Sequence, residues 1–409
     1  MLGSSPANQD QSVTQPDQGS DREVSYVSER ITWHMCKSIG PYIDMFDMFH
    51  GQIFGNATIL MASLLFLRSR ASYATITAPF SQAVSSIMSG NQSAGVSDVL
   101  VIGGGPGGLS VATGLARQLY TTIVFDNGVY RNARSQHMHN VAGWDHQSPA
   151  AFREKSRQDL LDRYDTIRFE DVAIEAVRKN AAGLFEADDA TGRTWTGRKL
   201  MLATGVRDVY PDIPGYDEVW GYRVYHCLFC HGFEQRNAKS VGVLAIGDLS
   251  NPKVALHMAY QAQRLAQNVV VYTDGASDVA EQVELGVQPG FKITVEQRSI
   301  ERLSMGPNNS EVVVQLSGGE EQVQGFLVHR PKAEVNGPFA RQLALELTEA
   351  GDIKTSQPFH ETSVSGCFAV GDCATYMKAV TSAISMGALG AGGLASQLQM
   401  LPPVAPGKI

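Results

Sequence analysis

The sequence predicts an α/β protein with two parallel sheets, each built from the order strand, tight turn, helix and strand. A run of β-branched residues at 99–102 leads through closely spaced glycines into a helix with an apolar face. Residues 240–275 repeat the order strand, helix, strand, and residues 366–395 join another strand to a helix rich in small residues. Strands that alternate with helices build parallel sheets covered by helices. We therefore predict two Rossmann-like units.

The composition is that of a globular protein without a nucleic-acid partner. Hydrophobic residues make up 43% of the 409 residues and charged residues 18%. The formal net charge is −8, and no basic block is present to neutralise phosphates. The cysteines form a sparse, odd-numbered set, unlike a secreted disulfide framework, which fits a reducing compartment. They are Cys36, Cys227, Cys230, Cys367 and Cys373.

The first 96 residues differ in composition from the rest. Residues 1–22 are rich in Gln, Ser and Asp and are predicted to be disordered. The apolar segment Ile53–Leu67 is shorter than the roughly 20 residues that a membrane span needs. The segment Met61–Ser97 lacks acidic residues and resembles an organelle transit peptide. The alternatives are an ordinary amphipathic extension or an over-long gene model. We expect a cytoplasmic protein and leave organelle targeting open.

The first strand–helix unit has the residues of a dinucleotide site. Residues 97–126 read SDVLVIGGGPGGLSVATGLARQLYTTIVFD. Gly103 permits the tight turn, Gly105 lets the backbone approach a pyrophosphate, and Gly108 lets helix and strand pack closely. The helix N-terminus offers N–H groups to the phosphates. Asp126, 18 residues after Gly108, is placed to accept a hydrogen bond from a ribose hydroxyl.

The last strand–helix segment identifies the dinucleotide. Residues 366–395 read GCFAVGDCATYMKAVTSAISMGALGAGGLA, and this resembles the C-terminal flavin segment of disulfide reductases with two dinucleotide domains. The resemblance implies that Asp372 binds the ribityl chain of FAD. It also implies that the backbone at Ala379 and Val380 meets the pyrimidine end of the flavin. LATG at 202–205 is similar to the crossing point between the two domains of such proteins.

The stretch YHCLFCHG places two cysteines between two histidines. Cys227 and Cys230 can share one helical turn and cycle between dithiol and disulfide. The alternative is half of a zinc site, but zinc takes four ligands and no second pair has the spacing of a zinc site. We predict no metal. An imidazole titrates near pH 6.5, so His226 or His231 can take protons from thiols, and His231 is the better candidate.

The position of the cysteine pair resembles that in thioredoxin reductases of the smaller type. Cys227 lies 22 residues after Gly205, as the C-x-x-C pair does in those proteins. The resemblance implies that Cys230 faces the flavin and that Cys227 faces the substrate. Those proteins have an aspartate after the second cysteine, whereas this chain has His231. A histidine favours dithiol oxidation because each turnover must deprotonate two substrate thiols.

The second strand–helix unit lacks the glycines of a nicotinamide site. The glycine offsets counted from Gly247 fall on Leu249 and Pro252. We expect the leucine side chain to stand where a pyrophosphate must approach. No arginine follows the second strand, and Asp274 is the one residue placed to read an NAD ribose. Electrons would then leave the flavin for a free acceptor, with O2 giving H2O2.

With these motifs together, the chain resembles the fungal gliotoxin-type dithiol oxidases over about residues 97–400. The matching stretches are 124–149, 202–208, 225–232, 334–345 and 368–381. The resemblance implies an FAD-dependent homodimer that closes a transannular disulfide in a small-molecule dithiol of the epidithiodiketopiperazine type. An NAD(P)H-dependent disulfide reductase is the alternative, and a non-catalytic flavoprotein that sequesters dithiols is a third hypothesis.

The resemblance and the motifs also imply domains and cofactor contacts. The expected order is an N-terminal extension (1–96), an FAD-binding domain in two parts (97–211 and 332–402), an inserted domain with the cysteine pair (212–331) and a tail (403–409). The expected FAD contacts are Gly103, Gly105, Pro106, Gly107, Gly108, Asp126, Asn127, Gly128, Arg131, Asn132, His137, Asn140, Val172, Ala203, Asp372, Ala379 and Val380.

Overall fold

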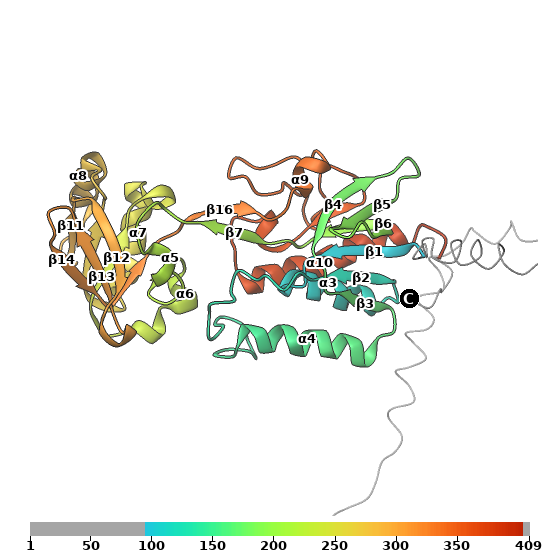
Figure 1. The fold of residues 1–409 in the computed structure, drawn as a ribbon, viewed down its shortest axis with the longest axis horizontal. Coiled ribbons are helices and arrows are strands. Elements are labelled where there is room, and N and C mark those ends of the chain that lie inside the picture. Colours follow the sequence, from blue (N-terminus) through green and yellow to red (C-terminus); the bar gives the residue numbers. More distant parts are fainter. Residues whose placement is uncertain (1–94, 404–409) are drawn as a thin grey trace, which may run out of the picture. The chain divides into compact units, whose positions relative to one another are not determined.

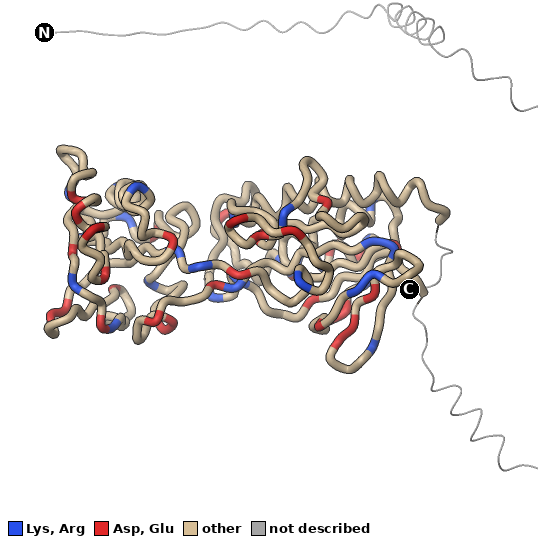
Figure 2. The backbone as a smooth tube through the Cα atoms, turned by 90° about the horizontal axis from the view of Figure 1, so that it is seen from above, with Lys and Arg blue, Asp and Glu red and all other residues tan. Residues whose placement is uncertain are grey.

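The computed structural model describes residues 95–403, whose helices and strands are labelled in Figure 1. The expectations for the disordered segment, the short apolar segment and the transit-peptide resemblance lie outside the described residues. Among residues 95–403, no helix combines the length and the apolar character that crossing a bilayer requires. Acidic and basic residues are interspersed along this part of the chain, without a basic stretch (Figure 2).

The first sheet has seven strands in the order β3-β2-β1-β6-β5-β4, with β17 beside β6. Strands β3, β2, β1, β6 and β17 pair in parallel, whereas β5 is antiparallel to both β6 and β4. Its central strands are buried β-branched and aliphatic runs, as both faces are covered. The strands are β1 (Ser97–Ile102), β2 (Thr122–Phe125), β3 (Ile167–Glu170), β4 (Ile174–Lys179), β5 (Phe185–Asp189), β6 (Thr194–Leu202) and β17 (Cys367–Ala369).

Two helices from opposite ends of the described chain pack together against this sheet. They are α3 (Pro106–Ala116) and α10 (Val380–Leu398), and α4 (Pro149–Arg163) lies beside α3 (Figure 1). Glycines allow the contact: a Cβ on Gly387 would lie 2.5 Å from the carbonyl oxygen of Gly107. Because β17 runs parallel to β6, the turn before α10 reaches the same sheet edge as the turn before α3.

The second sheet has five parallel strands in the order β11-β10-β9-β15-β8. Helices α7 (Pro252–Gln263) and α8 (Ser277–Gly286) pack on one face. A three-stranded antiparallel sheet packs on the other. The strands are β8 (Val224–Tyr225), β9 (Ala238–Leu244), β10 (Ala266–Tyr272), β11 (Ile293–Glu296) and β15 (Phe326–Val328), with β12 (Ile300–Met305), β13 (Val312–Leu316) and β14 (Glu321–Gln324) antiparallel.

The chain passes between the two sheets through an antiparallel pair of strands. These are β7 (Val206–Val209) and β16 (Lys332–Val335), which lie between the labelled halves of Figure 1. The expected domain limits at residues 211 and 332 stay a prediction. The remaining short helices are α5 (Tyr216–Val219), α6 (Leu228–His231) and α9 (Phe339–Gln342), with 3₁₀ turns at Phe233–Gln235, Gly247–Leu249, Pro307–Asn309 and Gly371–Ala374.

The turn between β9 and α7 corrects one detail of the sequence prediction. Leu249 is fully buried in the core under α7, so its side chain does not stand in the space of a pyrophosphate. The nucleotide-binding turn differs in another way, because its polar groups have partners within the protein. The Asn251 side chain accepts a hydrogen bond from the Lys253 N–H (3.0 Å) and so caps α7 itself. The Asp274 carboxylate accepts from the Ile300 N–H (2.7 Å), so the residue expected to read a ribose closes a turn.

The packing of α10 on α3 gives a prediction about stability. Both Gly387→Ala and Gly392→Ala replace a helical glycine, a gain of about 1 kcal/mol in helix propensity. The new methyl at 387 meets a backbone carbonyl at 2.5 Å, whereas the methyl at 392 meets its nearest neighbour, in Phe359, at 3.8 Å. We expect Gly387→Ala to be about 1–3 kcal/mol less stable than Gly392→Ala in urea unfolding. Equal stabilities would contradict the close packing.

Candidate active site

The turn between β1 and α3 brings backbone close to backbone. Gly103 has a φ of +118°, and a Cβ there would lie 2.2 Å from the carbonyl oxygen of Ala203. A Cβ on Gly108 would lie 1.9 Å from the Gly103 carbonyl oxygen. The space beside Gly105 is open, with no atom within 4 Å of a Cβ. Gly105 is the N-cap of α3 and Pro106 its first residue, so no side chain caps the N–H groups. The turn can therefore cradle a phosphate.

The residue at the end of β2 lies over this turn. A Cβ on Gly104 would lie 2.1 Å from the Asp126 carboxylate. That carboxylate accepts hydrogen bonds from the Gly128 N–H (3.0 Å) and the Tyr130 hydroxyl (2.6 Å). Burial, together with Asp126, raises the pKa of Tyr130 to about 12. The sequence prediction missed Gly104 and Tyr130, since neither belongs to the glycine spacing.

A pocket of about 350 Å³ opens beside Asp126. Arg153 places its guanidinium over the Tyr130 ring, 3.7 Å from the centroid, and Arg157 also contributes to the wall. The cations and the acceptor suit the sugar and phosphate groups of a nucleotide. The lining residues are Gly104, Leu109, Asp126, Tyr130, Ala150, Arg153, Glu154 and Arg157.

The turn before α10 lies at the same sheet edge and contains Asp372. The Arg131 guanidinium joins Asp372 (3.1 Å) to Asp208, to which it donates two hydrogen bonds of 2.7 and 3.1 Å. Two expected FAD contacts, Arg131 and Asp372, are therefore partners of each other. The N-cap of α10 is Ala379, so no side chain caps the N–H groups from Val380 onward.

The other expected FAD contacts have local partners within the protein, and their role toward FAD stays a prediction. The side-chain amide oxygen of Asn127 accepts from the Val129 N–H (3.0 Å), and that of Asn132 accepts from the Arg153 guanidinium (3.0 Å). The remaining three have structural contacts. His137 stacks on the His146 ring, Val172 packs against the core under the first sheet, and the Ala203 N–H donates to the Ile102 carbonyl.

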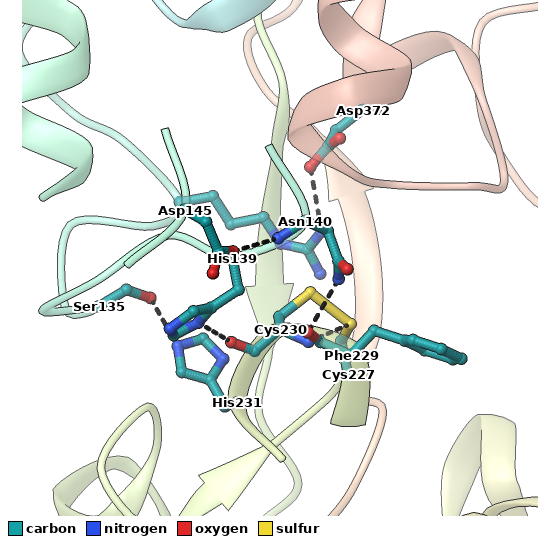
Figure 3. The surroundings of a disulfide bond; sticks show 10 residues. Ser135, His139, Asn140, Asp145, Cys227, Phe229, Cys230, His231 and Asp372 are labelled. Carbon is teal, nitrogen blue, oxygen red and sulfur yellow. Dashed lines mark hydrogen bonds and ion pairs between the residues drawn. A yellow bond between two sulfur atoms is a disulfide. The ribbon is translucent and has the colours of Figure 1, made fainter. Parts of the chain in front are cut away.

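Cys227 and Cys230 form a disulfide at the start of α6, with their Cα atoms 5.3 Å apart (Figure 3). The Cys227 sulfur also caps the helix by accepting from the Cys230 N–H (3.2 Å). Phe229, between the two cysteines, is 70% exposed. The redox pair thus has an exposed aromatic ring beside it.

The loop expected to contact FAD also contacts the disulfide turn. The Asn140 side chain donates to the Phe229 carbonyl (2.8 Å), and His139 Nδ1 lies 2.6 Å from the Cys230 carbonyl oxygen (Figure 3). Asn140 adopts a left-handed backbone conformation, with a φ of +61°. The sequence prediction missed His139, although three histidines within ten residues (137–146) were a visible signal.

Both histidines that flank the cysteines have depressed pKa values. Burial lowers the pKa of His226 to about 3, and the ring stacks on Trp220. Burial also lowers the pKa of His231, whose Nε2 lies 3.1 Å from the Ser135 hydroxyl. Nδ1 of His231 is buried without a partner among the described residues. An unpartnered lone pair costs less than an unpartnered N–H, so the proton belongs on Nε2, and Nδ1 can accept another.

Comparison with known proteins shows which family has this arrangement of helix termini and cysteines. The family profile described as pyridine nucleotide-disulphide oxidoreductase matches residues 97–387, which include both uncapped helix termini and the cysteine pair. The chain belongs to this family. A relative named thioredoxin reductase aclD, from Aspergillus oryzae, is 45% identical over 74% of this chain and 96% of its own length. Thioredoxin reductase sirT from Leptosphaeria maculans is 44% identical over 73% of this chain and 93% of its own length.

Solved structures give the same fold. An oxidoreductase from Agrobacterium tumefaciens is 27% identical, with a TM-score of 0.66 over 75% of this chain and all of that one. The structure of HlmI is 28% identical, with a TM-score of 0.66 over 75% of this chain and 93% of that one. The α/β class with two Rossmann-like units, the likeness to gliotoxin-type oxidoreductases and the FAD cofactor are confirmed.

This pyridine nucleotide-disulphide oxidoreductase is an FAD enzyme that acts on sulfur or disulfide groups. Its residues fit the cofactor: the open cradle at Gly105, the acceptor Asp126 and two uncapped helix N-termini lie on the first sheet. An uncapped N-terminus attracts phosphate or carbonyl oxygen through its N–H groups.

The glycine turn gives a prediction about FAD. Gly105→Val should keep the fold of the apoprotein, because its side chain enters open space and its φ of −77° suits any residue. That side chain occupies the phosphate cradle, so we expect FAD affinity to fall by at least about tenfold. Gly108→Val is the contrasting variant, because its Cβ meets a carbonyl at 1.9 Å and the fold itself should be lost. Flavin absorbance per chain and apoprotein circular dichroism measure the two effects. Full FAD retention by Gly105→Val would place the phosphates elsewhere.

Proposed function

We propose that the chain is an FAD-dependent dithiol oxidase that forms an intramolecular disulfide in a small-molecule dithiol and passes the electrons to O2, giving H2O2. The observation that carries the proposal concerns the strand–helix unit of the second sheet, where a nicotinamide dinucleotide would bind. There the Asn251 side chain caps α7 and Asp274 closes a turn, so the groups that would bind a nicotinamide dinucleotide are engaged within the protein. A disulfide enzyme without a nicotinamide site needs its electrons from the substrate dithiol.

The cysteine pair performs the exchange on its own sulfurs. A substrate thiolate attacks Cys227, which breaks the Cys227–Cys230 bond and releases the Cys230 thiolate. The second substrate thiolate then attacks the substrate sulfur bound to Cys227, which forms the substrate disulfide and releases the Cys227 thiolate. Bound FAD supplies a two-electron carrier that O2 can reoxidise. In sum, two thiols become one disulfide, and two electrons and two protons reduce O2 to H2O2.

The base that accepts substrate protons is His231 in this proposal. Its Nδ1 carries the free lone pair, and its Nε2–H is held by Ser135. The depressed pKa keeps the imidazole unprotonated, and therefore free to accept a proton, somewhat below pH 6.5. His226 has the lower pKa and stacks on Trp220, which supports a packing role beside the pair more than a proton-transfer role.

The substrate in this proposal is a small dithiol of the epidithiodiketopiperazine type, and the enzyme is a homodimer with the domain limits expected from the sequence. The exposed ring of Phe229 offers an apolar contact beside the sulfurs, which suits a compact heterocycle. Relatives named thioredoxin reductase favour the second candidate, an NAD(P)H-dependent disulfide reductase.

The two candidates differ in the source of the electrons. We expect the anaerobic holoenzyme to keep its flavin absorbance near 450 nm with NADPH or NADH and to lose it with a small dithiol. Air should then restore the absorbance, with about one H2O2 per disulfide formed. Rapid loss of the absorbance with NADPH would establish the reductase instead.

The base gives a prediction about pH. The tested variant is His231→Gln, and the control is the same substitution at His257, an exposed histidine on α7. Thiols titrate near pH 8.5, so a base matters more as the pH falls and thiolates become scarce. The ratio of wild-type to His231→Gln kcat/KM, measured by H2O2 formation, should therefore rise from pH 8.5 to pH 6 and reach about 10²–10⁴. A ratio that does not change with pH would remove His231 from the base role.

A further inference from the structure

Three side chains beside the redox pair form a cluster that the proposed oxidase mechanism does not use. His139 and His146 lie on the loop between β2 and α4, and Glu234 lies on the 3₁₀ turn that follows the disulfide helix. His139 Nε2 is 3.1 Å from His146 Nδ1 and 3.2 Å from the Glu234 carboxylate. The three potential ligand atoms all lie within 4.8 Å of one another.

In the neutral ring, His139 Nε2 can accept a hydrogen bond from His146 Nδ1, but its contact with Glu234 is then unsatisfied. Nδ1 lies 2.6 Å from the Cys230 carbonyl oxygen, which can only accept, so the ring proton must be on Nδ1. Nε2 then carries a lone pair, and that lone pair faces the negative oxygen of Glu234 at 3.2 Å. Two acceptors at this distance repel each other unless a cation lies between them. The cation is either a second ring proton or a metal ion.

The distances around His139 Nε2 suit a bound metal ion as well as a proton. Zinc binds imidazole nitrogen and carboxylate oxygen at about 2.0–2.2 Å, which sets neighbouring tetrahedral ligands about 3.3 Å apart. The distances of 3.1 and 3.2 Å from His139 Nε2 to the other two atoms are close to this value. A proton on His139 Nε2 accounts for the contact with the Glu234 carboxylate, but it does not explain why His146 Nδ1 also lies against the same nitrogen. In addition, zinc-bound histidines usually donate their other N–H to a carbonyl, as His139 can to Cys230.

The backbone holds the two histidines together at a cost. His146 has a φ of +57°, a left-handed conformation that few residues other than glycine adopt. An isolated bridge between Met138 and Gln147 closes the loop, and the His146 N–H donates to the Met138 carbonyl (2.8 Å). The His137 ring stacks on the His146 ring with centroids 4.1 Å apart. Strained residues that are held this firmly concentrate at binding sites.

We propose that His139 Nε2, His146 Nδ1 and the Glu234 carboxylate bind one Zn²⁺ ion, with water as the fourth ligand. The bound ion fixes the His139 proton on Nδ1, and this N–H then holds the Cys230 carbonyl and the disulfide turn (Figure 3). The site is distinct from a zinc site on the cysteines themselves. It does not depend on the proposed oxidase activity, because the ligands and their distances are the same for a reductase.

Zinc binding to the oxidised holoenzyme tests the proposal. The disulfide removes Cys227 and Cys230 as ligands, and Cys367 and Cys373 are buried thiols whose pKa values burial raises. Untagged protein is freed of metal with a chelator and titrated with ZnCl2 by calorimetry. We expect one Zn²⁺ per chain. Glu234→Gln and His146→Gln should each weaken binding by at least about 100-fold, beyond the 10- to 100-fold that loss of a second-shell contact costs.

The control variant is His257→Gln, which removes an exposed histidine outside the cluster and should leave zinc affinity unchanged. Flavin content and circular dichroism establish that each variant is folded. The proposal is overturned if the wild-type holoenzyme binds no Zn²⁺. It is equally overturned if the folded Glu234→Gln and His146→Gln variants bind as tightly as wild type.

Discussion

The close contact of α3 with α10 is the constraint on which the rest of the active site depends. The two helices are more than 250 residues apart in sequence, yet a glycine of one touches the backbone of the other. Because both follow parallel strands of one sheet, both present their N-termini at one edge, and neither terminus has a side-chain cap. A bulky side chain at Gly107 or Gly387 would separate the helices and move the two termini apart. The small residues of α10 thus position the two uncapped helix termini as well as fill the core.

The two sheets use similar strand–helix units for different purposes. In the first, the helix follows a glycine turn and its N–H groups remain available. In the second, Asn251 satisfies the helix terminus and Leu249 joins the core. The second unit therefore keeps its stability without a ligand, since its N–H groups have partners within the protein. It supplies a rigid support for β8 and α6, which carry the cysteine pair.

The loop 135–146 connects the first sheet, which carries the glycine turn, with the turn that carries the disulfide. It lies between β2 and α4 of the first sheet and contacts the disulfide turn through Asn140 and His139. Two of its residues, Asn140 and His146, adopt left-handed backbone conformations. Its contacts place the His139 ring within hydrogen-bond distance of the Cys230 carbonyl oxygen.

The sequence by itself determined the α/β class, the glycine turn, the flavin segment and the cysteine pair, because each is a local pattern whose spacing follows from backbone geometry. It also identified the missing glycines of the second unit. The tertiary structure alone decided where Leu249 points, because burial depends on the helix packed above it. It alone brought Arg131 between Asp208 and Asp372, and His139 beside Glu234. Asp208 lies 77 residues from Arg131 in the sequence, and Asp372 lies 241 residues from it. No spacing rule connects such distant residues, so side-chain clusters become visible only when the fold brings their elements together.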